Sequence, residues 1–379
     1  MKKRVLLYYP PNKRSVAIET LCKAVVDAGH YLTILTLTEK GSFHEAMEKQ
    51  GISTYCHVLE RRPTWKYFLQ HGRHLAKFCK EHRIDIIWSH LQEANIIALM
   101  AKYFIRPEVI AFRHHAESAF YAEYGKIFGM ERNKNEEKLD KIINRIADKI
   151  IVPSSGVWYG MDKYEKCNMS KVVLAPYIYD FSAYAKPDIN QVELLNDSLP
   201  CHLRLIMVSR MISSKQHMPV FKILNKLVKE GLSVKMIVMD DGPLRQELEK
   251  YIKENELEEH IKLVGFRTDF INFMASADLL IHPSLTEASN NVVKEIGLLE
   301  KGVAVCKNVG DFDDYILDGK NGFLIDRGNL EESIEKIIRK AYVDKAQLKE
   351  MGKALRQDVI RLFSDTPENK KRFTDLLQN

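Results

Sequence analysis

The chain has 379 residues, 45% of them hydrophobic, so it is long enough for two ordinary domains, each with its own core. Its 57 Lys and Arg against 51 Asp and Glu give a net charge of +6, which is too modest for this length to indicate a nucleic-acid partner. The cysteines are scattered, without a C-x-x-C pair or a histidine at zinc spacing, so neither a disulfide framework nor a zinc site is expected, and reduced thiols in a cytoplasm fit best.

The first elements along the chain form a βαβ unit. A basic start is followed by the apolar run Val5–Tyr9, which is too short for a signal peptide and instead predicts a buried parallel strand. Apolar residues at helical spacing continue until Gly29, and Tyr31–Leu35 predicts the next strand. Pro10–Asn12 occupies the turn where a G-x-G-x-x-G fingerprint would lie, so we expect no dinucleotide site here.

Further strands are predicted in two series with room for helices between them. They cover residues 84–88, 109–112, 149–152 and 172–174, and then 203–208, 234–238, 261–264, 279–281, 303–305 and 322–325. This alternation predicts the α/β class with two Rossmann-like domains facing across a cleft. We expect an N-terminal domain over residues 1–185, a linker over 186–200, a C-terminal domain over 201–360 and a C-terminal helix over 361–379. No run of about 18 apolar residues predicts a membrane-spanning helix.

Two segments are rich in charged residues. Residues 60–83 predict a helix with a basic surface, which suits an anionic membrane or a phosphorylated acceptor, although a solvated helix with an aromatic core face is the commoner arrangement. Its basic residues are Arg61, Arg62, Lys66, Arg73, Lys77, Lys80 and Arg83, beside Trp65, Tyr67, Phe68 and Phe78. Residues 131–149 mix both signs and predict an exposed helix with salt bridges.

The stretch Glu287–Glu295 carries two carboxylates around a predicted helix start. Ser289 and Asn290 are good N-caps, and apolar residues then recur at helical spacing. Glu287 is therefore expected in the loop and Glu295 in the helix, roughly 12 Å apart along the axis, with the free amides of the helix start between them. Such amides favour a phosphate, so the stretch suits a nucleotide sugar. The simpler alternative is a capped surface helix with two solvated carboxylates.

Two cations follow the strand predicted at 203–208. Arg210 comes directly after the strand, and Lys215 lies five residues later, where a helix with an apolar face begins. A diphosphate is bound well by this pair, because Arg makes bidentate contacts and Lys acts as a point charge. A lone Arg and Lys in a loop usually face solvent, but together with Glu287 and Glu295 they form a candidate site.

At this point the sequence resembles the family 4 glycosyltransferases, which have two Rossmann-like domains in the arrangement called GT-B. The resemblance covers residues 150–330 well and the first 150 residues only in layout. It is carried by motifs in the family's order, namely Arg210 with Lys215, Asp240-Asp241-Gly242-Pro243, Val264-Gly265-Phe266, the Glu287–Glu295 motif, Asp318–Leu324 and the segment Pro176–Phe181.

The resemblance implies a retaining transfer from a nucleotide diphosphate sugar, without a metal or other cofactor. UDP is the expected nucleotide because it is common in such enzymes. The acceptor would be a hydroxyl of a glycan or a lipid-linked molecule in the synthesis of cell-surface polysaccharide or another glycoconjugate. The expected location is the cytoplasm, at the inner face of the membrane, and the tail Leu362–Leu377 would pack back on the N-terminal domain.

The resemblance also implies roles for single residues. Arg210 and Lys215 would hold the diphosphate and stabilise charge on the leaving group. Glu287 would orient the donor sugar, and Glu295 would bind the ribose diol. The amides of Ala288, Ser289, Asn290 and Asn291 would lie near the phosphates, and the main chain of Gly265, Phe266 and Arg267 would face the base. A histidine near the sugar would be His114 first and His115 second; the alternative is a structural or solvated pair.

The sequence departs from the family pattern in three turns. The glycine-rich turn after the first strand is replaced by Tyr9–Arg14, where Lys13 and Arg14 offer positive charge instead. Asp240 replaces the first glycine of Gly-Asp-Gly-Pro. Ala288 replaces a glycine after Glu287, so that loop is less free in φ.

Three other functions remain open at this point. The first is a metal-dependent transferase, because Asp311-Phe312-Asp313 has the form of an Asp-x-Asp metal motif. The position of this motif favours the capped start of a helix instead. A sugar phosphorylase or a nucleotide-sugar epimerase would share the two-domain layout. A non-catalytic protein that binds nucleotide sugars would share it too.

Overall fold

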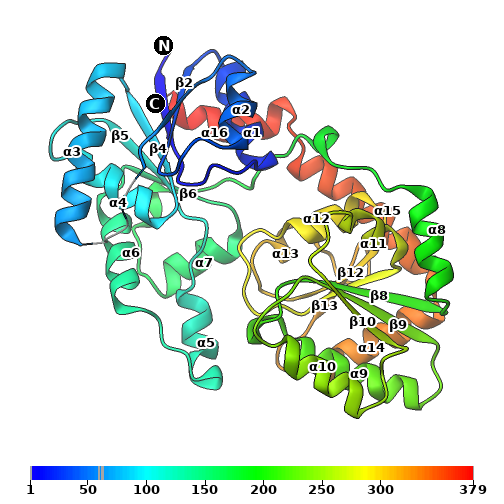
Figure 1. Ribbon diagram of the computed structural model, residues 1–379. Helices are drawn as coiled ribbons and strands as arrows, with labels where there is room; N and C mark the ends of the chain where they lie inside the picture. Colours follow the sequence, from blue (N-terminus) through cyan, green and yellow to red (C-terminus); the bar gives the residue numbers. More distant parts are fainter. Residues whose placement is uncertain (1, 59, 61–63, 379) are drawn as a thin grey trace. The chain divides into compact units, whose positions relative to one another are not determined.

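A computed structural model describes residues 2–58, 60 and 64–378 of the chain (Figure 1). By its internal contacts the chain divides into two compact units. Unit 1 comprises Met1–Ala183 and Phe363–Asn379, and unit 2 comprises Tyr184–Leu362. Each unit is an α/β domain with its own parallel sheet, so the predicted α/β class with two Rossmann-like domains is confirmed.

Unit 1 is built on a parallel sheet in the order β3-β2-β1-β4-β5-β6-β7. Its strands are β1 Arg4–Tyr8, β2 Tyr31–Thr36, β3 Ser53–Cys56, β4 Ile86–His90, β5 Glu108–Phe112, β6 Lys149–Val152 and β7 Val172–Leu174. Its helices are α1 Val16–Asp27, α2 Ser42–Glu48, α3 Trp65–His82, α4 Gln92–Ala101, α5 Ser118–Phe128, α6 Lys134–Ile146, α7 Ser155–Lys163, η1 Met169–Lys171, η2 Phe181–Ala183, α16 Pro367–Thr374 and η4 Asp375–Leu377, where η denotes a 3₁₀ helix.

Unit 2 repeats this plan with the order β10-β9-β8-β11-β12-β13. Its strands are β8 Leu203–Val208, β9 Val234–Met239, β10 Ile261–Gly265, β11 Leu279–His282, β12 Gly302–Cys306 and β13 Phe323–Ile325. Its helices are α8 Ile189–Ser198, η3 Ser213–Lys215, α9 His217–Lys229, α10 Arg245–Glu254, α11 Phe270–Ser276, α12 Asn291–Leu298, α13 Phe312–Tyr315, α14 Leu330–Val343 and α15 Lys345–Phe363.

The strand order in each sheet reverses once, between β1 and β4 in unit 1 and between β8 and β11 in unit 2. In open parallel sheets, ligands bind outside the carboxyl ends of the strands at such a reversal. Arg210 follows β8 and Glu287 follows β11. The residues predicted to bind the donor therefore lie at the place in unit 2 where the fold favours a ligand.

One strand of unit 1 was missed by the sequence analysis. β3 (Ser53–Cys56) lies at the edge of the sheet and pairs only with β2, and its side chains are exposed or half-buried. An edge strand with this exposure needs no apolar run, so the hydrophobic pattern contained little to indicate it.

The stretch 186–200 is not the simple linker that its polar composition predicted. It contains α8, which is part of unit 2. Asp188 caps this helix and its own amide donates to Asn272 Oδ1 at 2.8 Å. The buried Arg204 side chain donates to the carbonyls of Leu199 at 2.7 Å and Asn196 at 3.2 Å. The bond to Asn272, 84 residues away, and the bonds from Arg204 in β8 hold a helix whose sequence pattern alone is weakly amphipathic.

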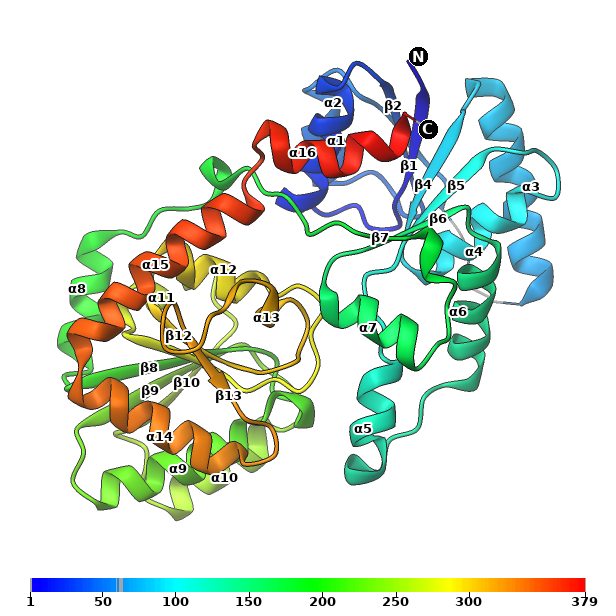
Figure 2. The same cartoon turned by 180° about the vertical axis from the view of Figure 1, so that it is seen from behind.

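The C-terminal segment returns to unit 1, where α16 lies beside α1 (Figure 2). Phe373 and Leu377 are fully buried in the same cluster as Val5 and Leu7 of β1. The amide of Tyr179 donates to the carbonyl of Phe363 at 2.7 Å. Burial of these apolar side chains is the force that closes the tail onto the first sheet.

The helix predicted over 131–149 is more buried than its charge pattern suggested. α6 places Asp140, Ile143 and Asn144 inside unit 1. Its charged side chains are therefore partly structural rather than solvated, as described below.

Within the described residues, no helix is long and apolar enough to cross a membrane. Arg61 and Arg62 of the predicted basic surface lie outside the described residues.

Candidate functional site

The centre of the site in unit 2 is a contact between Lys215 and Glu287. Lys215 Nζ donates to Glu287 Oε1, and it also donates to Ser284 Oγ at 3.1 Å. His282 Nε2 lies 2.7 Å from the same Glu287 oxygen. Because a carboxylate accepts, His282 carries its proton on Nε2 and donates to Glu287. Two residues, Lys215 beyond the end of β8 and His282 at the end of the adjacent strand β11, thus meet on one carboxylate.

Glu287 stays ionised because of these partners. Burial by itself raises the pKa of its carboxyl, but the hydrogen bond from His282 and the charges of His282 and Lys215 outweigh burial and hold the pKa well below its usual range. His282 is almost fully buried at the end of β11. His282 was not among the residues predicted from the sequence, although its place between a strand and Glu287 was a visible signal.

Glu295 is in a different electrostatic state. It lies inside α12, is half-buried by accessible surface and makes no hydrogen bond within the described part of the chain. Burial raises the pKa of its carboxyl to about 7, against the opposing charge of the neighbouring Lys294. A half-buried carboxylate without a donor is destabilised in its ionised form, which is typical of a group whose partner is a ligand.

Arg210 provides the second cation predicted for this site. It follows β8 directly, its side chain is exposed, and no ion pair or hydrogen bond engages its guanidinium among the described residues. Lys215, by contrast, is only 16% exposed and already paired with Glu287. The two predicted cations therefore follow the same strand, but Arg210 is exposed and unpaired within the described chain, whereas Lys215 is mostly buried and paired.

The start of α12 is held by a buried ion pair that the sequence analysis did not foresee. Asn290 caps the helix through Oδ1, which accepts from the Val293 amide at 3.1 Å. Lys294 Nζ donates to Asp311 Oδ2 at 2.6 Å and to Ser289 Oγ at 3.0 Å, and both charged side chains are only 1% exposed. The loop that follows Glu287 is thereby tied to α13.

Asp311 also overturns the interpretation of the Asp-x-Asp stretch as a helix cap. It precedes α13, but its side chain makes no capping bond. It accepts from Ser289 Oγ at 2.7 Å and from the Asn290 amide at 3.4 Å. One of the amides assigned to the phosphates, that of Asn290, therefore faces Asp311. Ala288 and Asn291 flank this tied segment.

A glycine makes this close approach possible. Gly310 has φ +58°, and a Cβ there would lie 3.0 Å from the Ala288 carbonyl oxygen and 3.0 Å from Glu287 Cβ. Ala288 itself does not adopt a positive φ. The glycine-to-alanine departure noted at position 288 is therefore tolerated by the loop.

The loop predicted to face the base follows β10. Gly265 has φ +70°, and Phe266 beside it is 78% exposed. Arg267 makes paired bonds of 2.8 Å to Asp269, and its guanidinium lies 5.2 Å from the centre of the Phe273 ring. The side chain of Arg267 is thus held back on the protein, which leaves the main chain and Phe266 as the exposed features.

Asp240 is strained at the neighbouring turn. It has φ +85°, in the left-handed region that favours glycine, and it is the position where the family pattern has glycine. Its Oδ1 accepts from the Asp241 amide at 2.8 Å, which compensates in part. The departure from glycine at this turn thus has a backbone cost.

The two candidate histidines of unit 1 differ in environment. His114 is half-buried, its Nδ1 contacts the Tyr177 hydroxyl, and its Nε2 lies 3.1 Å from His90 Nδ1. Burial, together with the charge of His115, lowers the pKa of His114 to about 3, so its ring is neutral at ordinary pH. His115 is exposed. His90 and Tyr177, which orient His114, were not selected from the sequence.

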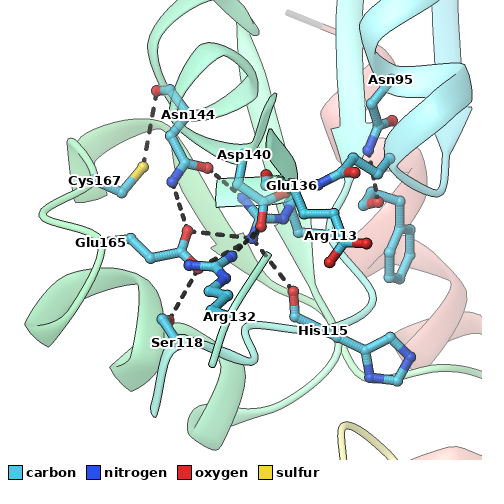
Figure 3. A network of polar contacts seen from close by, with 12 residues as sticks. Asn95, Arg113, His115, Ser118, Arg132, Glu136, Asp140, Asn144, Glu165 and Cys167 are labelled. Atoms are coloured by element: carbon cyan, nitrogen blue, oxygen red, sulfur yellow. Dashed lines mark hydrogen bonds and ion pairs between the residues drawn. The ribbon is translucent and has the colours of Figure 1, made fainter. Parts of the chain in front are cut away.

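A buried polar network centred on Arg113 contacts the loop that carries His115 (Figure 3). Arg113 Nη2 lies 3.1 Å from Asp140 and 3.2 Å from Glu165, and its Nη1 donates to Asn144 at 2.6 Å. Arg132 also pairs with Asp140. Arg113 Nη2 reaches the carbonyl of His115 at 3.4 Å, so the network supports the loop that carries both histidines.

A cavity of about 230 Å³ opens beside this network. Its lining includes Leu91, Gln92, Arg113, His114, His115 and Asp140. Leu91 has φ 69° and ψ 155°, a conformation that L-residues rarely adopt. Strain of this kind concentrates at functional sites, so this cavity is the candidate place for a second substrate in unit 1.

Positive charge after the first strand is only partly available. Arg14, suggested above as a substitute for the glycine-rich turn, is held by Glu19 through bonds of 2.9 and 2.6 Å.

Among the residues that the structure describes, no group of three or more His, Cys, Asp or Glu side chains is placed to hold a metal ion.

Comparison with known families identifies the chain. Residues 202–358 match the family model "Glycosyl transferases group 1", and residues 15–164 match the model "Glycosyltransferase Family 4". The two matches together cover most of the chain. The chain belongs to the family 4 glycosyltransferases. It is therefore an enzyme that transfers sugars, as the sequence analysis predicted.

Relatives of this glycosyltransferase are distant in sequence. A putative colanic acid biosynthesis glycosyltransferase of Salmonella typhimurium is 20% identical over 98% of both chains. An N-acetylgalactosamine-N,N'-diacetylbacillosaminyl-diphospho-undecaprenol 4-alpha-N-acetylgalactosaminyltransferase of Campylobacter jejuni is 22% identical, covering 72% of this chain and 73% of that relative. A Staphylococcus aureus poly(ribitol-phosphate) alpha-N-acetylglucosaminyltransferase is 24% identical over 41% of this chain and only 32% of its own length.

Solved structures confirm the GT-B type of fold. The Anabaena protein HepE, solved in complex with UDP, superposes with a TM-score of 0.79 over 100% of both chains at 18% identity. The same protein has also been solved with UDP-glucose. At this identity the likeness establishes the fold.

Proposed function

We propose that this glycosyltransferase moves a sugar from a UDP-sugar to a hydroxyl of a glycan or lipid-linked acceptor, with retention of the anomeric configuration. The observation that carries the proposal is the arrangement in unit 2. An ionised Glu287 is fixed by Lys215 and His282. Arg210, at the same edge of the sheet, and Glu295, in the helix that follows Glu287, have no hydrogen-bond partner within the described chain.

Each of these groups has a role that suits a nucleotide sugar. Arg210 and Lys215 would neutralise the diphosphate as the bond from the sugar C1 to the phosphate oxygen breaks, which is electrostatic stabilisation of the leaving group. Glu287 would accept hydrogen bonds from sugar hydroxyls, and His282 keeps it oriented. Glu295 would accept from the two ribose hydroxyls. The two cations meet the charge of the diphosphate without a cofactor.

The acceptor would bind in unit 1, in the cavity beside His114 and His115. Its walls combine Gln92, Asp140 and two arginines, and these groups suit the hydroxyls of a sugar ring. Because both ring nitrogens of His114 already have partners, we assign His114 a positioning role, and the exposed His115 is better placed to contact substrate.

The comparisons support the donor and acceptor classes. HepE of Anabaena was solved with UDP and with UDP-glucose, and the Campylobacter relative is named for a diphospho-undecaprenol acceptor. The Salmonella relative is named for the biosynthesis of a polysaccharide, colanic acid. By this analogy the reaction would take place in the cytoplasm, at the inner face of the membrane.

A ligand screen tests the proposal directly. Thermal unfolding is measured with UDP, GDP, ADP and CDP, and donor hydrolysis is then measured with sugars of the nucleotide that binds. We expect UDP to raise the melting temperature most and Glu295→Ala to weaken that shift. Lys215→Ala should lower turnover more than about tenfold, whereas the exposed Lys222→Ala on α9 should not.

The stereochemistry has its own readout. Proton NMR of the first product formed shows whether the anomeric configuration of the donor is kept. Inversion would refute the retaining mechanism, and the absence of any shift with all four nucleotides would refute the donor class. Full activity of Lys215→Ala would refute the assignment of the site.

A further inference from the structure

Helix α3 of unit 1 turns a defined face to solvent. Tyr67, Phe68 and Leu75 are buried on its inner side. Gly72 lies so close to α4 that a Cβ there would be 2.5 Å from Met100 Cβ. This tight packing fixes the rotation of α3 about its axis, and the opposite face lies on the outside of unit 1 (Figure 1).

The outward face of α3 is basic. Its exposed cations are Lys66, Arg73, Lys77 and Lys80. Within the described residues, Lys77 alone of these has an acidic partner, Glu81 at 3.8 Å, and that pair is exposed on both sides. Such a pair contributes little and is screened by salt. The positive charge of this face is therefore available to an external partner.

Two large apolar side chains accompany the charge. Trp65 is 58% exposed and Leu69 is 48% exposed, and their spacing of four residues places them on one side of the first turns of α3. The Trp65 ring packs edge-on to Phe68, with 6.1 Å between the ring centroids, and more than half of the Trp65 side chain stays open to solvent. Aromatic and aliphatic residues next to lysines and arginines are typical of helices that lie in the interface of a membrane.

Charge is distributed unevenly along the chain. Residues 1–183 contain 28 Lys and Arg against 20 Asp and Glu, whereas residues 184–362 contain 26 against 28. The excess of positive charge thus belongs to unit 1, where α3 lies. An anionic surface would attract this unit and not unit 2.

We propose that the outer face of α3 binds the surface of an anionic phospholipid bilayer, with Trp65 and Leu69 inserted between headgroups and the four cations contacting lipid phosphates. This binding does not depend on the proposed transferase activity. Each Lys or Arg close to such a surface strengthens binding about fivefold, so the four together account for a change of more than about 100-fold.

The test uses the full chain and vesicles that contain no sugar acceptor. Co-sedimentation is measured with phosphatidylcholine vesicles, with and without about one third phosphatidylglycerol. We expect binding only to the anionic vesicles, and its loss on raising the salt concentration. In a Trp158→Phe background, where the other tryptophan, Trp88, is buried, the emission of Trp65 should shift to the blue on binding.

A charge-matched pair of variants makes the test specific. The first replaces Lys66, Arg73, Lys77 and Lys80 with Gln. The control replaces Lys222, Lys229, Lys250 and Lys336, exposed helical lysines of unit 2, with Gln. The α3 variant should bind anionic vesicles at least about 100-fold more weakly, and the control should lose only a few-fold.

Several outcomes would overturn the proposal. Equal losses in both variants would show that net charge alone acts. Equal binding to both kinds of vesicle would remove the anionic requirement. Binding of heparin or of a soluble phosphorylated glycan through α3, without binding to vesicles, would assign the face to a different partner.

Discussion

Replacing Glu295 with Gln should stabilise this enzyme at high pH while weakening its nucleotide binding. Burial raises the pKa of Glu295 to about 7 from the ordinary value of 4.5. Between these two values the folded chain holds more of this proton than the unfolded chain does. The free energy of unfolding therefore falls as pH rises through this window.

The size of the effect follows from the two pKa values. They differ by about 2.5, and each pKa unit corresponds to about 1.4 kcal/mol, so the ionised side chain costs about 3 kcal/mol at pH 8.5. Gln has nearly the same shape and carries no charge. Glu295→Gln should thus gain about 3 kcal/mol at pH 8.5 and almost nothing at pH 4.5.

Urea denaturation followed by far-ultraviolet circular dichroism at several pH values measures this difference. Glu258→Gln, an exposed glutamate of the same unit, is the matched control and should show no such trend. A stability difference for Glu295→Gln that does not change between pH 4.5 and 8.5 would refute the reasoning. UDP should stabilise the variant less than the parent at pH 8.5, because the neutral amide of Gln offers the ribose hydroxyls one accepting oxygen in place of the two oxygens of an ionised carboxylate.

The remaining predictions concern partners described above. Lys294→Met should lower the free energy of unfolding by about 3–5 kcal/mol, because it leaves Asp311 buried without its cation. The double variant Lys294→Met/Asp311→Asn should regain much of this loss in the same denaturation assay. A double variant no more stable than Lys294→Met would contradict the ion pair. Asp240→Gly should raise stability by about 1 kcal/mol by removing strain at φ +85°, visible as a higher melting temperature, and a lower one would disprove the strain. UDP binding to the parent enzyme should weaken as pH falls below about 7, since Glu295 becomes protonated, and this pH dependence should disappear in Glu295→Gln.

Local patterns in the sequence were sufficient to predict most of the strands and the start of the helix in the candidate site. Buried parallel strands are short apolar runs, so β6, β7 and β8 were placed at their observed bounds. The start of α12 was placed correctly because Asn290 is a strong N-cap followed by an apolar stripe. The polar edge strand β3 and the helix α8 were missed, since tertiary hydrogen bonds rather than local periodicity hold them.

By itself the sequence determined which residues stand at the carboxyl ends of the strands in unit 2, because strand bounds and helix caps are local properties. Only the tertiary structure decided the state of each group there. Glu287 and Lys215 are 72 residues apart, and Lys294 and Asp311 are 17 apart, so neither pair follows from spacing. Burial raises the pKa of both glutamates of the motif, but only Glu287 has partners, His282 and Lys215, that outweigh burial, so the two pKa shifts are opposite. Residue type alone carries no information on that difference.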